Sequence, residues 1–363
     1  MTFRSAVDRW HTLLPPLALI ALALTWGSSP AGVLAALLGV LLAGSVLAGV
    51  HHAEVIAARV GDPFGSIILA IAVTIIEVGL IVMTMSGPKA QPTLARDTVF
   101  AAVMITLNLI VGVSLLVNAG RSGEARFRSK GSGGMLAAVM TLATVTMVLP
   151  NFTANPGPTY TPAQLGFAAV ASLALYVLFV LTQTKSHRDY FLPVDSSGQQ
   201  VDAGDDHGHR PTDRETLVSV GMLVASLVAV VGLAKVETHA IEDGLAALGL
   251  PASFVGVVIA LLVLAPETLA AGRAAARDRV QTSFNLAYGS AVASIGLTIP
   301  VLAVVSTVYP TPLHLGLEPI HLALLALTCL VSILTVVPGR ASRLQAGVHL
   351  VIFAAYVFLA ASP

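Results

Sequence analysis

Long apolar stretches separated by short polar segments make up most of this chain. A membrane-spanning helix needs about 20 consecutive apolar residues, and runs of roughly that length recur from one end of the sequence to the other. The pattern predicts an all-α polytopic membrane protein. We expect eleven spanning helices, at about residues 13–26, 31–50, 65–86, 97–118, 134–150, 162–182, 215–235, 252–272, 282–307, 319–337 and 341–360.

Two of these runs each contain one carboxylate deep inside, at matching places in the two halves of the chain. Phe64 precedes Glu77 by thirteen residues, and Phe254 precedes Glu267 by the same interval. Five helices are an odd number, so the two copies should lie inverted in the membrane, as in many secondary transporters. We therefore expect a leading helix in 1–30, repeats in 31–183 and 215–363, and a linker in 184–214.

The basic residues indicate the orientation of the helices. If the N-terminus is cytoplasmic, sixteen Lys and Arg residues fall in cytoplasmic segments, and only Lys89, Arg96 and Lys235 fall outside. Cytoplasmic loops carry such an excess, which predicts an N-terminus inside and a C-terminus outside. The first run could also be a signal peptide, but Thr25-Trp26-Gly27 offers no clean cleavage site, so we expect a retained helix.

Composition narrows the class of protein further. The chain is 56% hydrophobic and 10% charged, whereas soluble domains carry about 25% charged residues. Its formal net charge is zero, so nothing suggests a nucleic-acid partner. The single cysteine, Cys329, excludes a disulfide framework and a thiolate metal site. We expect membrane lipid around the protein; the sequence is silent on oligomeric state.

Glu77 and Glu267 carry the candidate chemistry. A charged residue near the bilayer centre costs roughly 2.5–3.5 kcal/mol on insertion scales, so such carboxylates are usually functional. Neither span contains a Lys or Arg at that depth. Two buried acids would bind either a metal cation or protons, because burial and mutual repulsion disfavour two bare charges. That mutual exclusion is the basis of an antiporter, with no cofactor and no covalent step.

Neighbouring polar residues could complete the cation site. Thr74 lies three residues before Glu77 and shares its helix face. Asn108 is the only amide in the interior of its span, and Ser290 and Ser294 lie in the equivalent span of the second half. Each could instead play a structural role. Pro266 has no N–H, so the carbonyl of the residue four positions earlier loses its helical partner and could bind an ion.

Four further residues stand at the expected membrane edges, His52 and Glu54 in the first half and His239 and Glu242 in the second. In the inverted topology they fall on opposite sides, where they could guide cations or relay protons. Ordinary interfacial polar residues would follow the same pattern. No histidine is expected deep in the apolar core.

The predicted linker, residues 184–214, has two possible interpretations. The low hydrophobicity of the linker favours a solvent-exposed connection between the two repeats. Asp205, Asp206, His207 and His209 could alternatively form a low-affinity cation or pH sensor, although they lack the spacing of a structural metal site.

Three segments resemble the calcium/cation antiporter superfamily, in its cation/proton exchanger branch and within it the bacterial ChaA-type calcium/sodium:proton antiporters. They are G-D-P-F-G-S-I-I-L-A-I-A-V-T-I-I-E-V, L-A-P-E-T-L-A-A-G-R-A-A-A-R-D-R-V-Q and N-L-A-Y-G-S-A-V-A-S-I-G-L-T-I-P. The resemblance covers nearly the whole chain and implies that Glu77 and Glu267 bind ion and proton, with Asn108 as the family's amide. The wider branch has Gly-Asn shortly before each glutamate, and this chain does not, which leaves Ca²⁺, Na⁺ and K⁺ open.

The sequence therefore predicts a cation/proton antiporter of the inner membrane that exports Ca²⁺, Na⁺ or K⁺ by alternating access. One alternative is a transition-metal transporter, although carboxylate and hydroxyl ligands suit hard cations better. A second alternative, an intramembrane hydrolase, is disfavoured because the spans contain no aspartate pair and no H-E-x-x-H motif.

Overall fold

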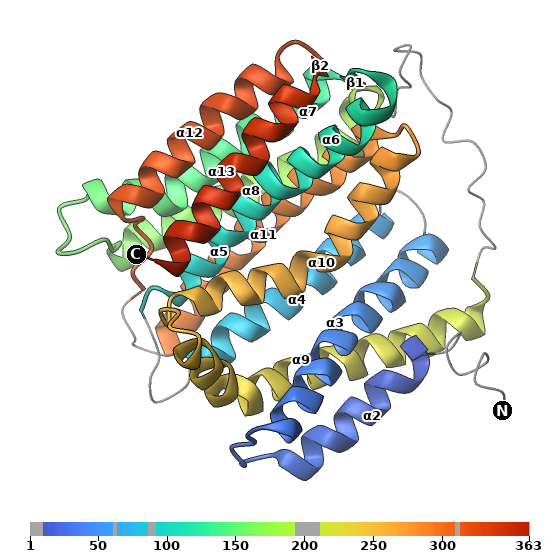
Figure 1. Cartoon of the computed structure of the whole chain (residues 1–363), viewed down its shortest axis with the longest axis vertical. Helices are drawn as coiled ribbons and strands as arrows, with labels where there is room; N and C mark the ends of the chain where they lie inside the picture. The colour runs from blue at the N-terminus through green and yellow to red at the C-terminus, as the bar shows by residue number, and fades with distance from the viewer. Residues whose placement is uncertain (1–9, 61–63, 86–91, 193–210, 309–312, 363) are drawn as a thin grey trace. The chain divides into compact units, whose positions relative to one another are not determined.

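The computed structural model describes residues 10–60, 64–85, 92–192, 211–308 and 313–362. Within these ranges the chain forms eleven continuous helices in the predicted order, so the all-α polytopic fold is confirmed (Figure 1). The acidic and histidine positions proposed for the linker, from Asp205 to His209, lie outside the described residues.

The helices group into two compact units, and neither coincides with a sequence repeat. Unit 1 comprises residues 1–91 and 207–255, and unit 2 comprises residues 92–206 and 256–363. Each unit thus takes helices from both halves of the chain. The repeats at 31–183 and 215–363 remain a prediction from the sequence. The compact units follow the packing of the helices and have other boundaries.

The described part of unit 1 contains four helices: α2 (Trp10–Thr25), α3 (Val33–Val60), α4 (Phe64–Met85) and α9 (Asp213–Ala247). The longest pair, α3 and α9, packs side by side, and α2 and α4 each contact both. Small residues allow the close approach, since a Cβ at Gly79 of α4 would lie 2.5 Å from the Val231 side chain.

The α3–α9 pair is antiparallel. Gly39 faces Glu237, Gly49 faces Ser226, and His52 bonds to Ser219, so residue numbers rise along α3 as they fall along α9. These are the first helices after the leading helix and after the linker. Their opposite directions agree with the predicted inversion of the two repeats.

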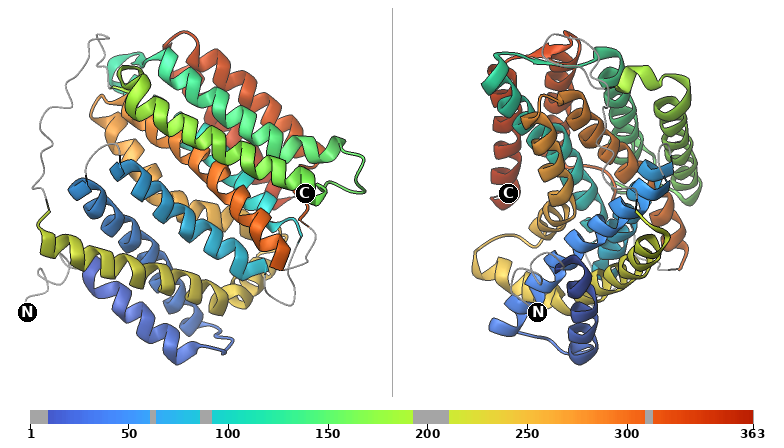
Figure 2. Two further views of the ribbon diagram at one scale, coloured as in Figure 1. Left: turned by 180° about the vertical axis from the view of Figure 1, so that it is seen from behind. Right: turned by 90° about the vertical axis from the view of Figure 1, so that its right-hand side faces the viewer.

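Unit 2 is built around α11 (Val280–Val308), which packs against most of its helices. Figure 2 shows α7, α8 and α11 packed together. The other elements are α5 (Leu94–Met104), the π-turn η1 (Ile105–Ile110), α6 (Val111–Ser122), β1 (Ala125–Arg126), α7 (Ser129–Ala143), η2 (Thr144–Val148), η3 (Leu149–Phe152), α8 (Pro162–Leu181), η4 (Thr182–Ser186), η5 (Arg188–Phe191), α10 (Phe254–Ala276), α12 (Pro319–Val336), β2 (Arg340–Ala341) and α13 (Arg343–Ala361).

Short polar segments tie the helices of unit 2 together at their ends. Strands β1 and β2 pair antiparallel, with Ala125 opposite Ala341 and Arg126 opposite Arg340. Capping boxes begin α8 at Thr161 and α13 at Ser342, where each side-chain hydroxyl accepts a backbone N–H of the first turn. The sequence therefore specifies these helix starts locally.

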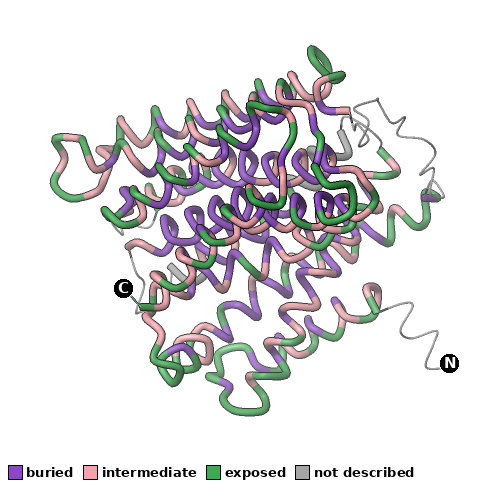
Figure 3. The backbone as a smooth tube through the Cα atoms, turned by 45° about the horizontal axis from the view of Figure 1, so that its top comes forward, coloured by how far each residue is buried: buried purple, intermediate pink, exposed green. Residues whose placement is uncertain are grey.

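By length and apolar composition, nine helices in the described part of the chain are able to cross a membrane. Two shorter apolar helical stretches, Trp10–Thr25 and Ile71–Val82, lie at the remaining predicted spans. Figure 3 shows buried positions alternating with exposed ones along most helices. Large exposed apolar side chains such as Leu24 and Phe152 fit a lipid-facing surface.

Two helices extend well beyond the membrane spans predicted for them. The span placed at 31–50 continues as α3 to Val60, and the span placed at 215–235 continues as α9 to Ala247. Polar residues end an apolar run without ending a helix, because their backbone still forms the helical hydrogen bonds. The polar residues expected at the edges consequently lie within these helices.

Arg96 at the start of α5 is almost fully buried, and its guanidinium donates hydrogen bonds to three acceptors. Its Nε donates to Asp97 at 2.8 Å, and its two terminal nitrogens donate to Gly316 O and to Glu318 Oε1, each at 3.1 Å. Arg96 and Asp97 are 4% and 7% exposed. The guanidinium thus neutralises a buried carboxylate while it connects α5 to the segment before α12.

We expect Arg96→Ala to lower the free energy of unfolding by about 3–5 kcal/mol, because it leaves the Asp97 charge buried and uncompensated. Arg96→Lys should restore only part of the loss, since an ammonium cannot reach three acceptors as a planar fork does. Unfolding of the detergent-purified protein measures both. Arg340→Ala is the control, because its 3.5 Å pair with Glu124 is exposed and surface pairs contribute about 0–1 kcal/mol. Equal effects of the two alanine variants would contradict the prediction.

Candidate functional site

Glu77 lies in the middle of α4, in unit 1. Its side chain is 4% exposed, and that of Thr74, one turn earlier on the same face, is 6% exposed. The long and mostly apolar sequence of α4 favours a membrane-spanning helix here. The close approach at Gly79 sets α4 directly against α9. A carboxylate and a hydroxyl therefore share one buried helix face, as the sequence predicts.

Glu267 lies in α10, in unit 2, and is 8% exposed. Pro266 sits inside this helix and cannot donate the hydrogen bond that the Leu262 carbonyl would otherwise accept. Thr268 Oγ1 donates to the Leu264 carbonyl at 2.7 Å, so its hydroxyl is directed to the backbone. The second buried carboxylate thus stands next to a break in the helical hydrogen bonding. Each unit carries one of the two glutamates.

Ser290 and Ser294 lie one turn apart on α11, which packs against η1 and α5 within unit 2. Ser294 is 5% exposed and Ser290 is half-buried. Thr298, a further turn along, is fully buried, and its hydroxyl has no hydrogen-bond partner among the described residues. The face of α11 therefore presents three hydroxyls in a row, and Thr298 is the most deeply buried of them.

Asn108 is held in a buried side-chain network. Its amide nitrogen donates to Thr328 Oγ1 at 3.1 Å, and its amide oxygen lies 3.2 Å from His349 Nδ1. His349 Nε2 lies 3.1 Å from Thr335 Oγ1. All four residues have 0% exposure. An amide oxygen can only accept, so His349 donates from Nδ1 and accepts the Thr335 proton at Nε2.

His349 contradicts the expectation that no histidine lies deep in the apolar core. It belongs to α13, and Asn108 belongs to η1, a π-turn within a long helix; such turns are frequent at functional sites. The sequence indicated the buried amide but not its partner, because 241 positions separate the two residues. An isolated histidine in the final apolar run was the available signal.

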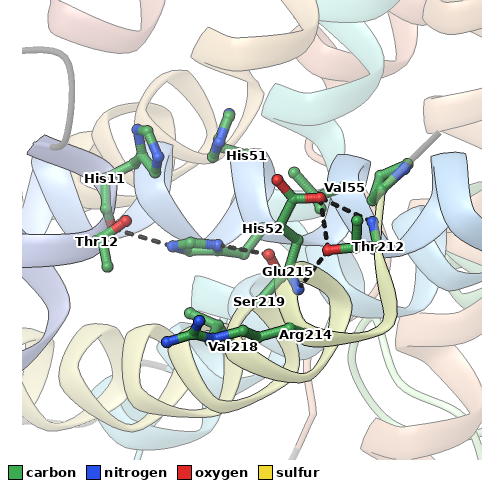
Figure 4. Close-up of a pocket in the computed structure, with 11 residues that line it drawn as sticks. His11, Thr12, His51, His52, Val55, Thr212, Arg214, Glu215, Val218 and Ser219 are labelled. Carbon is green, nitrogen blue, oxygen red and sulfur yellow. Dashed lines mark hydrogen bonds between the residues drawn. The ribbon is translucent and has the colours of Figure 1, made fainter. Parts of the chain in front are cut away.

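His52 is buried at a pocket of about 600 Å³ in unit 1 (Figure 4). Its Nε2 lies 3.0 Å from the His11 carbonyl, which can only accept, and its Nδ1 lies 3.2 Å from Ser219 Oγ. The His11 and His51 rings are 4.1 Å apart, and each lies within 5.6 Å of the His52 ring. A cluster of three imidazoles thus occupies this end of α3.

The other expected edge residues are more exposed. Glu54 is exposed on α3, and His239 is exposed on α9, where its Nδ1 lies 3.8 Å from Oε2 of Glu242. Such a surface pair contributes about 0–1 kcal/mol. His52 and His239 lie towards opposite ends of the antiparallel α3–α9 pair. The structure therefore keeps them apart, and it adds His11 and His51 to His52.

Comparison with known proteins identifies the family. Residues 28–185 and 218–361 match the family described as sodium/calcium exchanger protein. The sodium-potassium/proton antiporter ChaA of Escherichia coli (strain K12) is 34% identical over 95% of this chain and 94% of its own length. The y4hA protein of Sinorhizobium fredii (strain NBRC 101917 / NGR234) is 44% identical over 89% of this chain and 87% of its own length.

Solved structures agree on the fold. The structure of native YfkE superimposes with a TM-score of 0.68 at 18% identity, covering 96% of this chain and 97% of the other. The H⁺/Ca²⁺ exchanger CAX superimposes with a TM-score of 0.67 at 15% identity, covering 96% and 91%. The chain therefore belongs to the sodium/calcium exchanger protein family and is a multi-pass membrane transporter, an antiporter rather than an enzyme.

Proposed function

We propose that this chain exports Ca²⁺ in exchange for protons, with Na⁺ and K⁺ as alternative substrates, across the inner membrane of a bacterial cell. Glu77 and Glu267 are the acids that bind either the cation or protons. Thr74, Asn108, Ser290 and Ser294 supply further oxygen ligands. The N-terminus is cytoplasmic and the C-terminus lies outside.

The observation that carries this proposal is the burial of one carboxylate in each unit, at 4% and 8% exposure, within apolar helices. A buried carboxylate is stable only when a cation, a proton or hydrogen bonds compensate its charge. Hydroxyl and amide oxygens on α4, η1 and α11 are the hard ligands that Ca²⁺ and alkali cations prefer. Exchange of cation for protons at these acids requires neither ATP nor a covalent step.

The names of the relatives support two classes of substrate, alkali cations and Ca²⁺. The Escherichia coli relative is named a sodium-potassium/proton antiporter, and the 25% identical relative of Aphanothece halophytica is named a Ca²⁺/H⁺ antiporter. We place Ca²⁺ first because two carboxylates neutralise one divalent ion. Na⁺ and K⁺ remain substrates of the same site, because the amide that precedes each glutamate in the wider branch is absent here.

A transition-metal transporter is the less favoured alternative. The three-histidine cluster offers imidazole ligands, but both ring nitrogens of His52 already have partners, His11 O and Ser219 Oγ. Among the described residues, no group of three His, Cys, Asp or Glu side chains is arranged to hold a metal ion. The carboxylates of α4 and α10 again favour hard cations.

The test uses purified protein in liposomes with an imposed pH gradient and a pH-sensitive dye inside. Ca²⁺, Na⁺, K⁺, Mg²⁺ and Zn²⁺ are added one at a time, and we expect Ca²⁺ to dissipate the gradient at the lowest concentration. A response to Na⁺ or K⁺ alone would keep proton-coupled exchange and change the substrate. A response to micromolar Zn²⁺ with indifference to Ca²⁺ would contradict the proposal, as would a correctly folded protein that responds to no ion.

A further inference from the structure

A second cavity of unit 1 contains a buried acid that the proposed exchange does not use. The cavity measures about 520 Å³ and lies between the beginning of α3 and the last turns of α9. Glu237 of α9 lines it, together with Asp243. It therefore lies at the opposite end of the α3–α9 pair from His52, which faces Ser219 near the start of α9.

Small residues of α3 form the wall opposite Glu237. Ala35, Ala36 and Gly39 follow a spacing that puts them on one helix face, and all three line the cavity. A Cβ placed at Gly39 would lie 4.0 Å from Glu237 Oε2, so this carboxylate oxygen faces a position without a side chain. The room beside the carboxylate results from these small residues.

Glu237 itself is 4% exposed, and its Oε1 has no hydrogen-bond partner in the part of the chain that the structure describes. Among the described residues that line the cavity, none is Lys, Arg or His. Lys235 and His239 each lie two residues from Glu237 in sequence, and both are exposed. The Lys235 ammonium lies 5.1 Å from the centre of the Trp26 ring, and His239 Nδ1 lies 3.8 Å from Glu242 Oε2. A buried carboxylate without a basic partner is costly, so a bound cation or a proton has to compensate its charge, and the cavity provides room for a cation.

The charges in the cavity indicate which ligand fits. One buried carboxylate, with Asp243 exposed at the rim, balances a single positive charge at the buried position. Oxygen donors select hard cations over transition metals. We propose that Glu237 forms a second binding site for a monovalent inorganic cation, Na⁺ or K⁺.

Glu237 and Glu77 lie at different heights along α3. Ile76, the residue before Glu77, faces Gly49 of α3, whereas Glu237 faces Gly39. Ten residues of helix correspond to about 15 Å. A cation bound at Glu237 would therefore lie near one end of α3. The idea that cations pass through this site on their way to Glu77 rests on the proposed function, whereas cation binding at Glu237 does not.

The test measures cation binding in protein whose two central acids are removed, Glu77→Gln with Glu267→Gln. Titration calorimetry with NaCl, KCl and CaCl₂, with choline chloride as the ionic-strength blank, should detect saturable Na⁺ or K⁺ binding. Adding Glu237→Gln should weaken that binding at least about tenfold, as expected when a buried charged ligand is lost. Adding Glu124→Gln instead, at an exposed position, should leave the binding unchanged.

Thermal unfolding provides a second readout that does not depend on transport. Without the two central acids, Na⁺ or K⁺ should raise the unfolding midpoint, and Glu237→Gln should remove this increment without lowering the midpoint in choline. Binding that survives Glu237→Gln, or binding of Ca²⁺ alone, would overturn the site. A wild-type protein that fails to transport any ion would refute the proposed function and leave this result standing.

Discussion

Glu77→Gln and Glu267→Gln should each abolish cation-dependent proton movement in liposomes. Glutamine keeps the size and one oxygen of the side chain but removes the negative charge and the titratable proton. Loss of a charged partner at a buried site costs about 3–5 kcal/mol, which corresponds to roughly a hundredfold to several thousandfold weaker cation binding. The proton cycle would fail as well, because an amide does not take up the returning proton.

Glu124→Gln is the matched control for this prediction. Glu124 is exposed, lies in the segment between α6 and β1, and pairs with exposed Arg340 at 3.5 Å. The same substitution there should leave both ⁴⁵Ca²⁺ binding and proton movement at the wild-type level. Normal transport by Glu77→Gln, or by Glu267→Gln, would remove that acid from the mechanism and reopen the assignment of the cation site.

His349→Leu should destabilise unit 2 by about 2–4 kcal/mol. The substitution removes the donor that satisfies the amide oxygen of Asn108, and an unsatisfied buried acceptor costs about 1–3 kcal/mol. The different shape of leucine adds a packing penalty of about 1 kcal/mol. Chemical unfolding of the detergent-purified protein measures this loss. His349→Gln, which can still donate to Asn108, should recover part of it.

A double-mutant cycle separates this network from simple packing. Asn108→Leu and His349→Leu together should cost less than the sum of the two single variants, because each single variant leaves the other polar group unsatisfied. Additive losses would show that the 3.2 Å contact contributes nothing of its own. The hydrogen bonds to Thr328 and His349 fix the orientation of the Asn108 amide.

Much of the fold followed from local patterns of the sequence. The length and apolarity of each run predicted eleven helices in order, because a backbone in lipid has to satisfy its own hydrogen bonds within a helix. The matching positions of Glu77 and Glu267 predicted two buried acids, and both are buried. These features depend only on residues near one another in sequence. The exceptions were the ends of α3 and α9, where polar residues continue the helix.

Contacts between distant segments could not be predicted in the same way. Helical periodicity says that a face is apolar or polar but not which other helix covers it. His349 therefore gained its role only through the fold that brings α13 against η1, and His52 only through α2 and Ser219. Packing also joined α9 of the second half to α3 and α4 of the first, which left Glu237 buried beside the small residues of α3. The apolar pattern along the chain thus specifies the helices and the acids inside them, whereas side-chain packing between helices decides which polar groups meet.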